Sequence, residues 1–98
     1  MKFAVIILPE AKQDLKLAAT WYNKQKKGIG SQFLFQVRKS KTVLQSNPHF
    51  AKRYRNVHTL PLRKFPFMIH FTIDKSKMTV TILAVLHASQ DPDKWPKE

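Results

Sequence analysis

The last third of the chain constrains the fold most strongly, because it holds two β-rich segments on either side of a short polar turn at residues 75–77. Apolar side chains alternate along both segments, as they do in half-buried strands. In the first segment, the residues predicted to share a face are Phe65, Phe67, Ile69, Phe71 and Ile73. In the second, they are Met78, Val80, Ile82, Ala84 and Leu86. A hairpin this apolar predicts a sheet with at least one face covered.

The residues before this hairpin predict an opening strand and two helices. Pro9 suits the first turn of a helix and ends the strand before it. Gly28 is well suited to end that helix in the left-handed conformation. Ser31 is then the expected N-cap of a second helix, which should end before Pro48 because proline restricts the residue preceding it. The two helices therefore form a hairpin whose apolar faces need a sheet to cover.

A further short strand is predicted at residues 54–60, after a basic connection. The complete order is strand, helix, helix and three strands, which predicts an α+β domain with the helical hairpin packed on an antiparallel sheet. The 98 residues are expected to form a single domain, with residues 88–98 as a C-terminal tail. The opening apolar run is too short for a membrane span, so we expect a cytoplasmic protein that does not engage a membrane.

The charge balance predicts a macromolecular partner. Eighteen Lys and Arg residues face six Asp and Glu residues, which gives a formal net charge of +12. Such a field attracts nucleic acid or an acidic protein. The chain has no cysteine, and its four histidines lack the spacing of metal ligands, so neither a metal nor a cofactor is predicted.

Several basic side chains are candidates for contacting nucleic acid or another target: Arg53, Arg55, Arg63, Lys64 and His87. RNA cleavage by attack of the 2′-hydroxyl needs a base, an acid and cations, but no metal. If the chain is a nuclease, its catalytic set would be Arg63, Lys64 and His87. The alternative, which is favoured, is that these cations contact phosphates or are solvated and that His87 ends a strand.

Two sets of aromatic residues are candidate contact surfaces. Trp21 and Tyr22 are adjacent on the first predicted helix, so one is expected in the core and the other partly exposed to a protein partner. Trp95 lies in the C-terminal tail, where its indole could fold back over the domain or contact the target.

The motifs occur in a recognisable order along nearly the whole chain: Ala11-x-x-Asp14-Leu15, Trp21-Tyr22, Gly28-Ile29-Gly30, Phe33-Leu34, Asn47-Pro48 and residues 63–67, 83–87 and 91–95. On these motifs the chain resembles the RelE/ParE superfamily of bacterial type II toxin–antitoxin toxins. The resemblance implies the α+β fold predicted above. It also implies a cognate antitoxin that wraps and neutralises the toxin, and binding of operator DNA through that complex.

The two branches of this superfamily differ in mechanism. RelE-like toxins cut mRNA on the ribosome with basic residues and a C-terminal tyrosine, whereas ParE-like toxins poison DNA gyrase. Positions that resemble the basic ones of a RelE-like toxin hold Pro61, Met68 and Ser89 here, and the tail lacks a tyrosine. Since the loss of one transition-state contact typically costs about a hundredfold in rate, the resemblance favours the ParE-like branch.

Three hypotheses follow from the sequence. The first is a ParE-like toxin that inhibits growth by binding DNA gyrase, with no chemistry of its own. The alternative is a ribosome-dependent mRNA endoribonuclease that uses Arg63, Lys64 and His87. The third is an inactive, toxin-derived domain that still binds the antitoxin.

Overall fold

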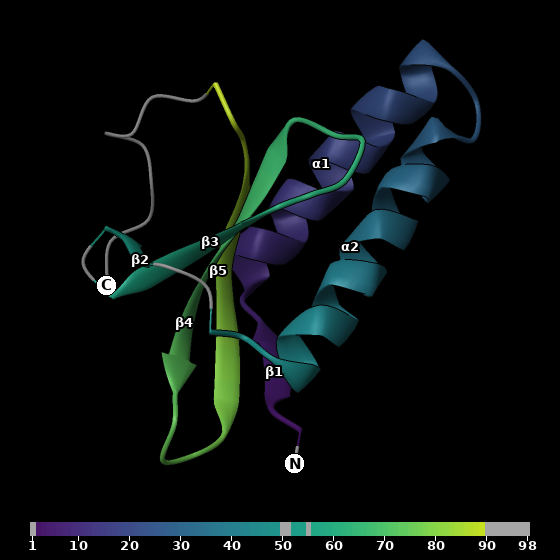
Figure 1. Ribbon diagram of the computed structural model, residues 1–98. Coiled ribbons are helices and arrows are strands. Elements are labelled where there is room, and N and C mark those ends of the chain that lie inside the picture. The colour runs from purple at the N-terminus through teal and green to yellow at the C-terminus, as the bar shows by residue number, and fades with distance from the viewer. Residues whose placement is uncertain (1, 50–51, 55, 90–98) are drawn as a thin grey trace.

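A computed structural model describes residues 2–49, 52–54 and 56–89, with the backbone alone described for residues 52–54. It confirms the predicted α+β class, with two helices side by side on one face of a sheet (Figure 1). The helices are α1 (Pro9–Gln25) and α2 (Ile29–Ser46). The strands are β1 (Ala4–Ile7), β2 (Lys52–Tyr54), β3 (Val57–Pro61), β4 (Phe67–Asp74) and β5 (Thr79–His87).

The sheet is mixed and not wholly antiparallel as the sequence predicted, because β1 pairs in parallel with β5. The strand order is β1-β5-β4-β3-β2. Strands β3, β4 and β5 follow one another through short connections, which impose antiparallel pairing. No such connection joins β1 to its neighbour, so sequence proximity does not fix its direction. The single strand expected over residues 54–60 is divided between β2 and β3.

The turn between the helices is tighter than predicted. Gly28 has the expected left-handed backbone, with a φ of 94°, but α2 begins directly after it at Ile29, so Ser31 is not the N-cap. The cap comes from the other helix instead. The Oδ1 atom of Asn23 accepts a hydrogen bond of 2.8 Å from the backbone N–H of Gly30, a donor that would lack a partner within α2.

A bulge in β5 changes which of its side chains face the helices. His70 lies opposite Ala84 and Phe71 lies opposite Ile82, so Leu83 is the extra residue. Before the bulge, the predicted face is correct. After it, the alternation shifts by one residue, and Val85 packs in the core where Ala84 was expected. The bulge therefore also turns His87, two residues further on, toward the helices.

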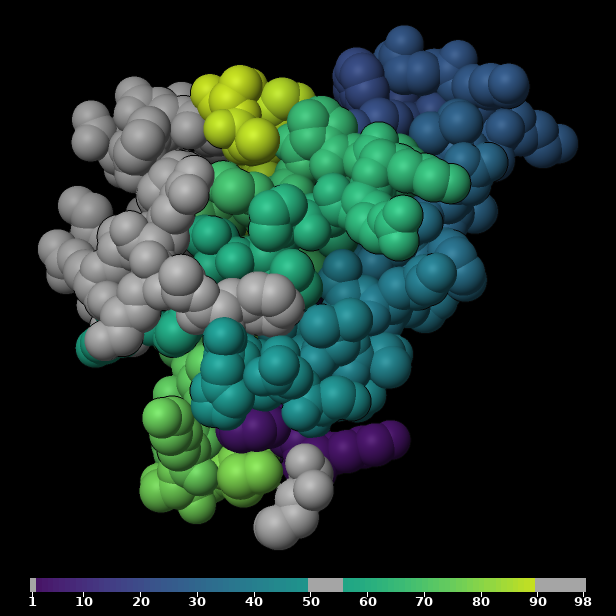
Figure 2. All heavy atoms as spheres, viewed as in Figure 1, coloured from purple at the N-terminus to yellow at the C-terminus, as the bar shows by residue number. Residues whose placement is uncertain are grey.

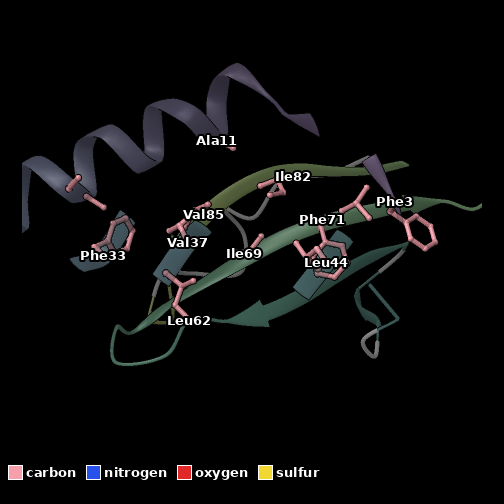
Figure 3. Close-up of a cluster of buried hydrophobic side chains, with 13 residues drawn as sticks. Phe3, Ala11, Phe33, Val37, Leu44, Leu62, Ile69, Phe71, Ile82 and Val85 are labelled. Carbon is pink, nitrogen blue, oxygen red and sulfur yellow. The ribbon is translucent and has the colours of Figure 1, made fainter. Parts of the chain in front are cut away.

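The core lies between the helices and the sheet. Figure 3 shows Ile69, Phe71, Ile82 and Val85 of the sheet in one layer with side chains of α2. Ala11, Phe33 and Leu44 are completely buried within this layer. Full burial of a large apolar side chain contributes about 1.5–3 kcal/mol, so this layer fixes the helical hairpin on the sheet. Each long edge of the hairpin borders a groove.

Candidate functional site

The first groove lies between α1 and the end of β5, and we call it the α1 groove. It consists of two adjoining hollows of about 320 and 330 Å³ that share Ala18, Phe67 and His87. The other lining residues are Asp14, Leu17, Trp21, Tyr22, Pro66, Val85 and Leu86. β1 pairs only with residues Thr79–Ile82 of β5. Among the described residues, the edge of β5 beyond Ile82 therefore has no neighbouring strand on this side.

Trp21 and Tyr22 divide their roles as the sequence predicted. Tyr22 packs into a cluster of aromatic rings, with centroids 5.0 Å from Phe65 and 5.5 Å from Phe33. Burial raises the pKa of the Tyr22 hydroxyl, which keeps it neutral. Trp21 packs edge-on against Tyr22 but remains 56% exposed at the rim of the α1 groove. Leu17, one turn earlier, is 60% exposed. Two large apolar side chains thus face solvent beside the groove.

His87 lines the α1 groove and is exposed, with its ring against that of Phe67 at a centroid distance of 5.3 Å. Its Nδ1 atom is 3.1 Å from the backbone nitrogen of Ser89 and 2.7 Å from the Ser89 hydroxyl. A backbone N–H can only donate, so Nδ1 acts as the acceptor and the proton of the neutral ring is on Nε2. In this tautomer, His87 presents a hydrogen-bond donor and an aromatic face, while its Nδ1 atom is engaged by Ser89.

Asp14 connects α1 to the bulge in β5. Its Oδ2 atom accepts a hydrogen bond of 3.0 Å from the backbone N–H of Val85. Burial raises the pKa of the Asp14 carboxyl, the bond from Val85 opposes that shift, and the nearby charge of Glu10 adds to it. Asp14 appeared in the sequence only as part of a family motif. Its partner lies 71 positions away, so no local pattern could have identified this contact.

The second groove lies between α2 and the end of β3, and we call it the α2 groove. It measures about 590 Å³ and is lined by Gln36, Lys39, Ser40, Thr42, Val43, Leu60, Pro61 and Arg63. Figure 2 shows the blue side chains of α2 against the green ones of the segment that follows β3. At its rim, the Lys39 ammonium lies 5.4 Å from the centre of the exposed Phe35 ring. Sequence reasoning found Arg63 but missed the α2 side of this groove.

The loop between β3 and β4, residues 62–66, separates the two grooves. Leu62 is buried, whereas Arg63 and Lys64 are exposed. Lys64 has a φ of 70°, a left-handed conformation that strongly favours glycine. The carbonyl of Pro66 accepts a hydrogen bond of 2.7 Å from Ala88, which fixes the loop to the end of β5.

The structure does not gather the predicted nuclease set into a single pocket. Arg63 lines the α2 groove and His87 lines the α1 groove, while Lys64 lines neither of them. It does bring His87 together with Trp21 and Tyr22, which the sequence had assigned to a separate surface. Arg55 and Trp95 lie outside the described residues, and Arg53 lies in β2, where the backbone alone is described.

The two grooves differ in charge. Neither α2 nor β3 contains an acidic residue, whereas α1 contributes Glu10 and Asp14 on the side of the α1 groove. In the part of the chain that the structure describes, no three His, Asp or Glu side chains are grouped as metal ligands. Among the same residues, no helix has the length and apolar character needed to cross a membrane.

The fold is that of the RelE and ParE toxins. A chain of a chromosomal ParDE toxin–antitoxin system from Pseudomonas aeruginosa matches with a TM-score of 0.76 and 17% identity, covering 89% of this chain and 97% of that one. A chain of the intact RelBE complex from Escherichia coli matches with a TM-score of 0.67 and 13% identity, covering 90% of this chain and 99% of that one. A chain of the RelBE2 complex from Mycobacterium tuberculosis matches with a TM-score of 0.60 and 21% identity, covering 89% of this chain and 99% of that one.

The family follows from the sequence itself. The model of the family described as "ParE toxin of type II toxin-antitoxin system, parDE" matches residues 5–92, and the chain therefore belongs to this family of toxins. No curated protein resembles the chain closely enough in sequence to count as a relative. The expected superfamily and its ParE-like branch are thus confirmed.

Proposed function

We propose that this toxin inhibits growth in the cytoplasm by binding DNA gyrase through the α1 groove, without chemistry of its own, and that a cognate antitoxin neutralises it. The observation that carries the proposal is the state of His87. Its Nδ1 atom is occupied by the N–H and hydroxyl of Ser89, and its ring packs against Phe67. A residue held in this way suits recognition better than proton transfer.

The surroundings of His87 support binding to a large partner. Trp21 and Leu17 are more than half exposed beside a groove that is mostly apolar. Exposed tryptophans that enter a partner's pocket commonly contribute about 2 kcal/mol or more to binding. The net charge of +12 would steer the toxin toward an enzyme that carries DNA.

The supporting geometry is weaker for the ribonuclease alternative. Cleavage requires cations close to the reacting phosphate together with the acid and the base. Arg63 and His87 line different grooves, and the β3–β4 loop lies between them.

A supercoiling assay tests the proposal. Purified gyrase should lose its ability to supercoil relaxed plasmid as the toxin is added, and ribosome-bound mRNA should stay intact at the same toxin concentration. Codon-dependent cuts in that mRNA, abolished by His87→Ala and by Arg63→Ala, would establish the ribonuclease alternative instead. Unaffected growth on expression without the antitoxin would contradict both and support the inactive domain.

A further inference from the structure

One end of the domain carries a patch of positive charge, which we call the cationic end. Two segments form it, the end of α1 with the turn that follows it and the β3–β4 loop. Phe65 of the loop packs against Tyr22 of α1 and Phe33 of α2, with ring centroids 5.0 and 5.3 Å apart. Figure 2 shows the green loop beside the blue end of the hairpin. The cations of the two segments are all exposed: Lys24, Lys26, Lys27, Arg63 and Lys64.

The cationic end has no negative charge within its own segments. Residues 18–30 and 60–67 contain neither Asp nor Glu. In the described part of the chain, the acidic residues are Glu10 and Asp14 in the first half of α1 and Asp74 at the end of β4. Asp74 lies at the opposite end of the sheet, since Phe67 at the start of β4 is the residue that pairs with His87. A surface of one sign attracts a partner of the other sign.

Lys64 keeps its charge in an unfavourable backbone conformation. Its φ of 70° is left-handed, which glycine adopts freely and lysine does not. The loop is also held in place, because the carbonyl of Pro66 accepts a hydrogen bond of 2.7 Å from Ala88. Lys64 lines neither the α1 groove nor the α2 groove. Residues in such conformations cluster at functional sites, so an exposed, strained lysine on a fixed loop indicates a binding role.

We propose that the cationic end contacts the phosphate backbone of the DNA duplex that gyrase holds, while the α1 groove binds gyrase itself. This inference rests on the proposed function. The two surfaces adjoin at Pro66, which belongs to the β3–β4 loop and lines the α1 groove beside Trp21. A partner that fills the groove therefore lies next to the cationic end. The toxin would then recognise the enzyme together with its substrate.

The character of the cationic end favours phosphates over an acidic protein surface. A protein interface generally has a desolvated apolar or aromatic centre. The exposed large apolar side chains of the described residues include Trp21 and Leu17 on α1, but none lies within residues 22–30 or 62–67. Phosphate contacts need only cations, and they position a protein on DNA without reading its sequence. Exposed lysines, which act as hydrated point charges, suit this role.

Two pairs of lysines provide a matched test. Lys26 and Lys27 belong to the cationic end, whereas Lys75 and Lys77 are exposed in the turn between β4 and β5, at the opposite end of the sheet. The first pair changed to Gln gives the cationic-end variant, and the second pair changed to Gln gives the control variant. Both variants lose the same amount of charge, so any general weakening of the field is equal in the two. All four side chains are exposed, and thermal melts should show that both variants fold.

Fluorescence anisotropy would measure the affinity of the labelled toxin for purified gyrase, alone and loaded with a DNA duplex, over a series of salt concentrations. Against loaded gyrase, the cationic-end variant should bind about tenfold more weakly than the wild type. Its slope of log K against log salt concentration should fall by about 2, because each phosphate contact contributes about 0.9. Lys64→Gln should lower this slope by about 1. Against gyrase alone, both affinities should change by about twofold or less.

Each outcome bears on the inference. Equal losses for the cationic-end and control variants, or equal affinity of the wild type for gyrase with and without DNA, would overturn the inference and leave the proposed function standing. A loss for the cationic-end variant that is just as large on gyrase alone would overturn it in favour of an acidic surface of the enzyme. If the wild-type toxin binds gyrase in neither form, the proposed function fails as well.

Discussion

The two grooves lie on opposite sides of one helical hairpin and differ in nearly every property that governs binding. The α1 groove is aromatic, contains the acidic Asp14 and borders the part of β5 that has no neighbouring strand among the described residues. The α2 groove is aliphatic, has a cationic rim and borders a strand paired on both sides. One small fold thus presents two chemically distinct surfaces, which suits a toxin that must recognise both a target and an inhibitor.

The largest effect is expected at the contact between α1 and α2, the helical hairpin that forms one wall of each groove. The N-terminal turn of α2 lies so close to α1 that a Cβ atom on Gly30 would clash with the carbonyl of Ala19 and come within 2.6 Å of the Asn23 side chain. Gly30→Ala should therefore destabilise the fold by about 1–3 kcal/mol. For a domain of this size, each kcal/mol lowers the Tm by about 4–8 °C.

Thermal unfolding and both binding assays would test this prediction. The exposed neighbour Ser31 provides the control, because Ser31→Ala should change the free energy of unfolding by less than about 0.5 kcal/mol. Binding of gyrase and binding of the antitoxin should weaken together in Gly30→Ala. A variant that lost only one binding activity would show that the hairpin does not support them jointly.

The second prediction separates the grooves. Trp21→Ala removes the largest exposed side chain of the α1 groove and should raise the toxin concentration needed to inhibit supercoiling by about thirtyfold, equivalent to about 2 kcal/mol. The Tm should fall little, because the indole is 56% exposed. Inhibition by Trp21→Ala at wild-type concentrations would place the gyrase contact elsewhere on the toxin.

The third prediction concerns the contact that shapes the α1 groove. Asp14→Ala leaves the N–H of Val85 without its acceptor and should cost about 1–2 kcal/mol of unfolding free energy. Asp14→Asn keeps an acceptor oxygen and should cost less. Denaturant unfolding of the three proteins measures both differences.

The comparison of the wild type with Asp14→Asn also predicts how the free energy of unfolding depends on pH. Because burial raises the pKa of Asp14 above its ordinary value of 3.8, the folded state binds this proton more tightly than the unfolded state does. The resulting stabilisation is complete below 3.8 and is lost as the pH rises through the folded pKa. Relative to Asp14→Asn, the wild type should therefore lose stability as the pH rises from 3.8 through the folded pKa. A stability difference between the two proteins that changed in the opposite direction would contradict a raised pKa for Asp14.

The smallest effect is expected in the loop between the grooves. Lys64 has a left-handed backbone that costs a non-glycine residue about 1–2 kcal/mol, and glycine recovers part of this at an entropic cost of about 0.5–1 kcal/mol. Lys64→Gly should thus stabilise the fold slightly, by less than about 1 kcal/mol. Lys64→Ala keeps the strain and removes the charge, so any binding loss common to both variants belongs to the ammonium.

The sequence predicted the elements better than their arrangement. Alternating apolar residues predicted β4 and the first half of β5, and Pro9 and Gly28 predicted where α1 begins and where the turn lies. These are local signals. The bulge at Leu83 depends on pairing with β4, so it could not be read from the alternation, and it reverses the side on which His87 lies.

The candidate site was only partly predictable for the same reason. Arg63 and His87 stood out as chemical types, but the grooves that separate them form only when the sheet and the hairpin pack together. The role of Val43 could not be predicted, because in a sequence an exposed valine cannot be distinguished from a buried one until the helix is placed on the sheet. Asn23 likewise caps a helix other than its own.

Hydrogen exchange of the toxin, free and bound to gyrase, tests the division between the grooves most directly. Bound gyrase should protect residues 14–22 and residues 83–88 at the end of β5, and it should leave residues 36–43 and 60–63 unprotected. Protection of residues 36–43 by gyrase, with residues 14–22 unprotected, would contradict the account.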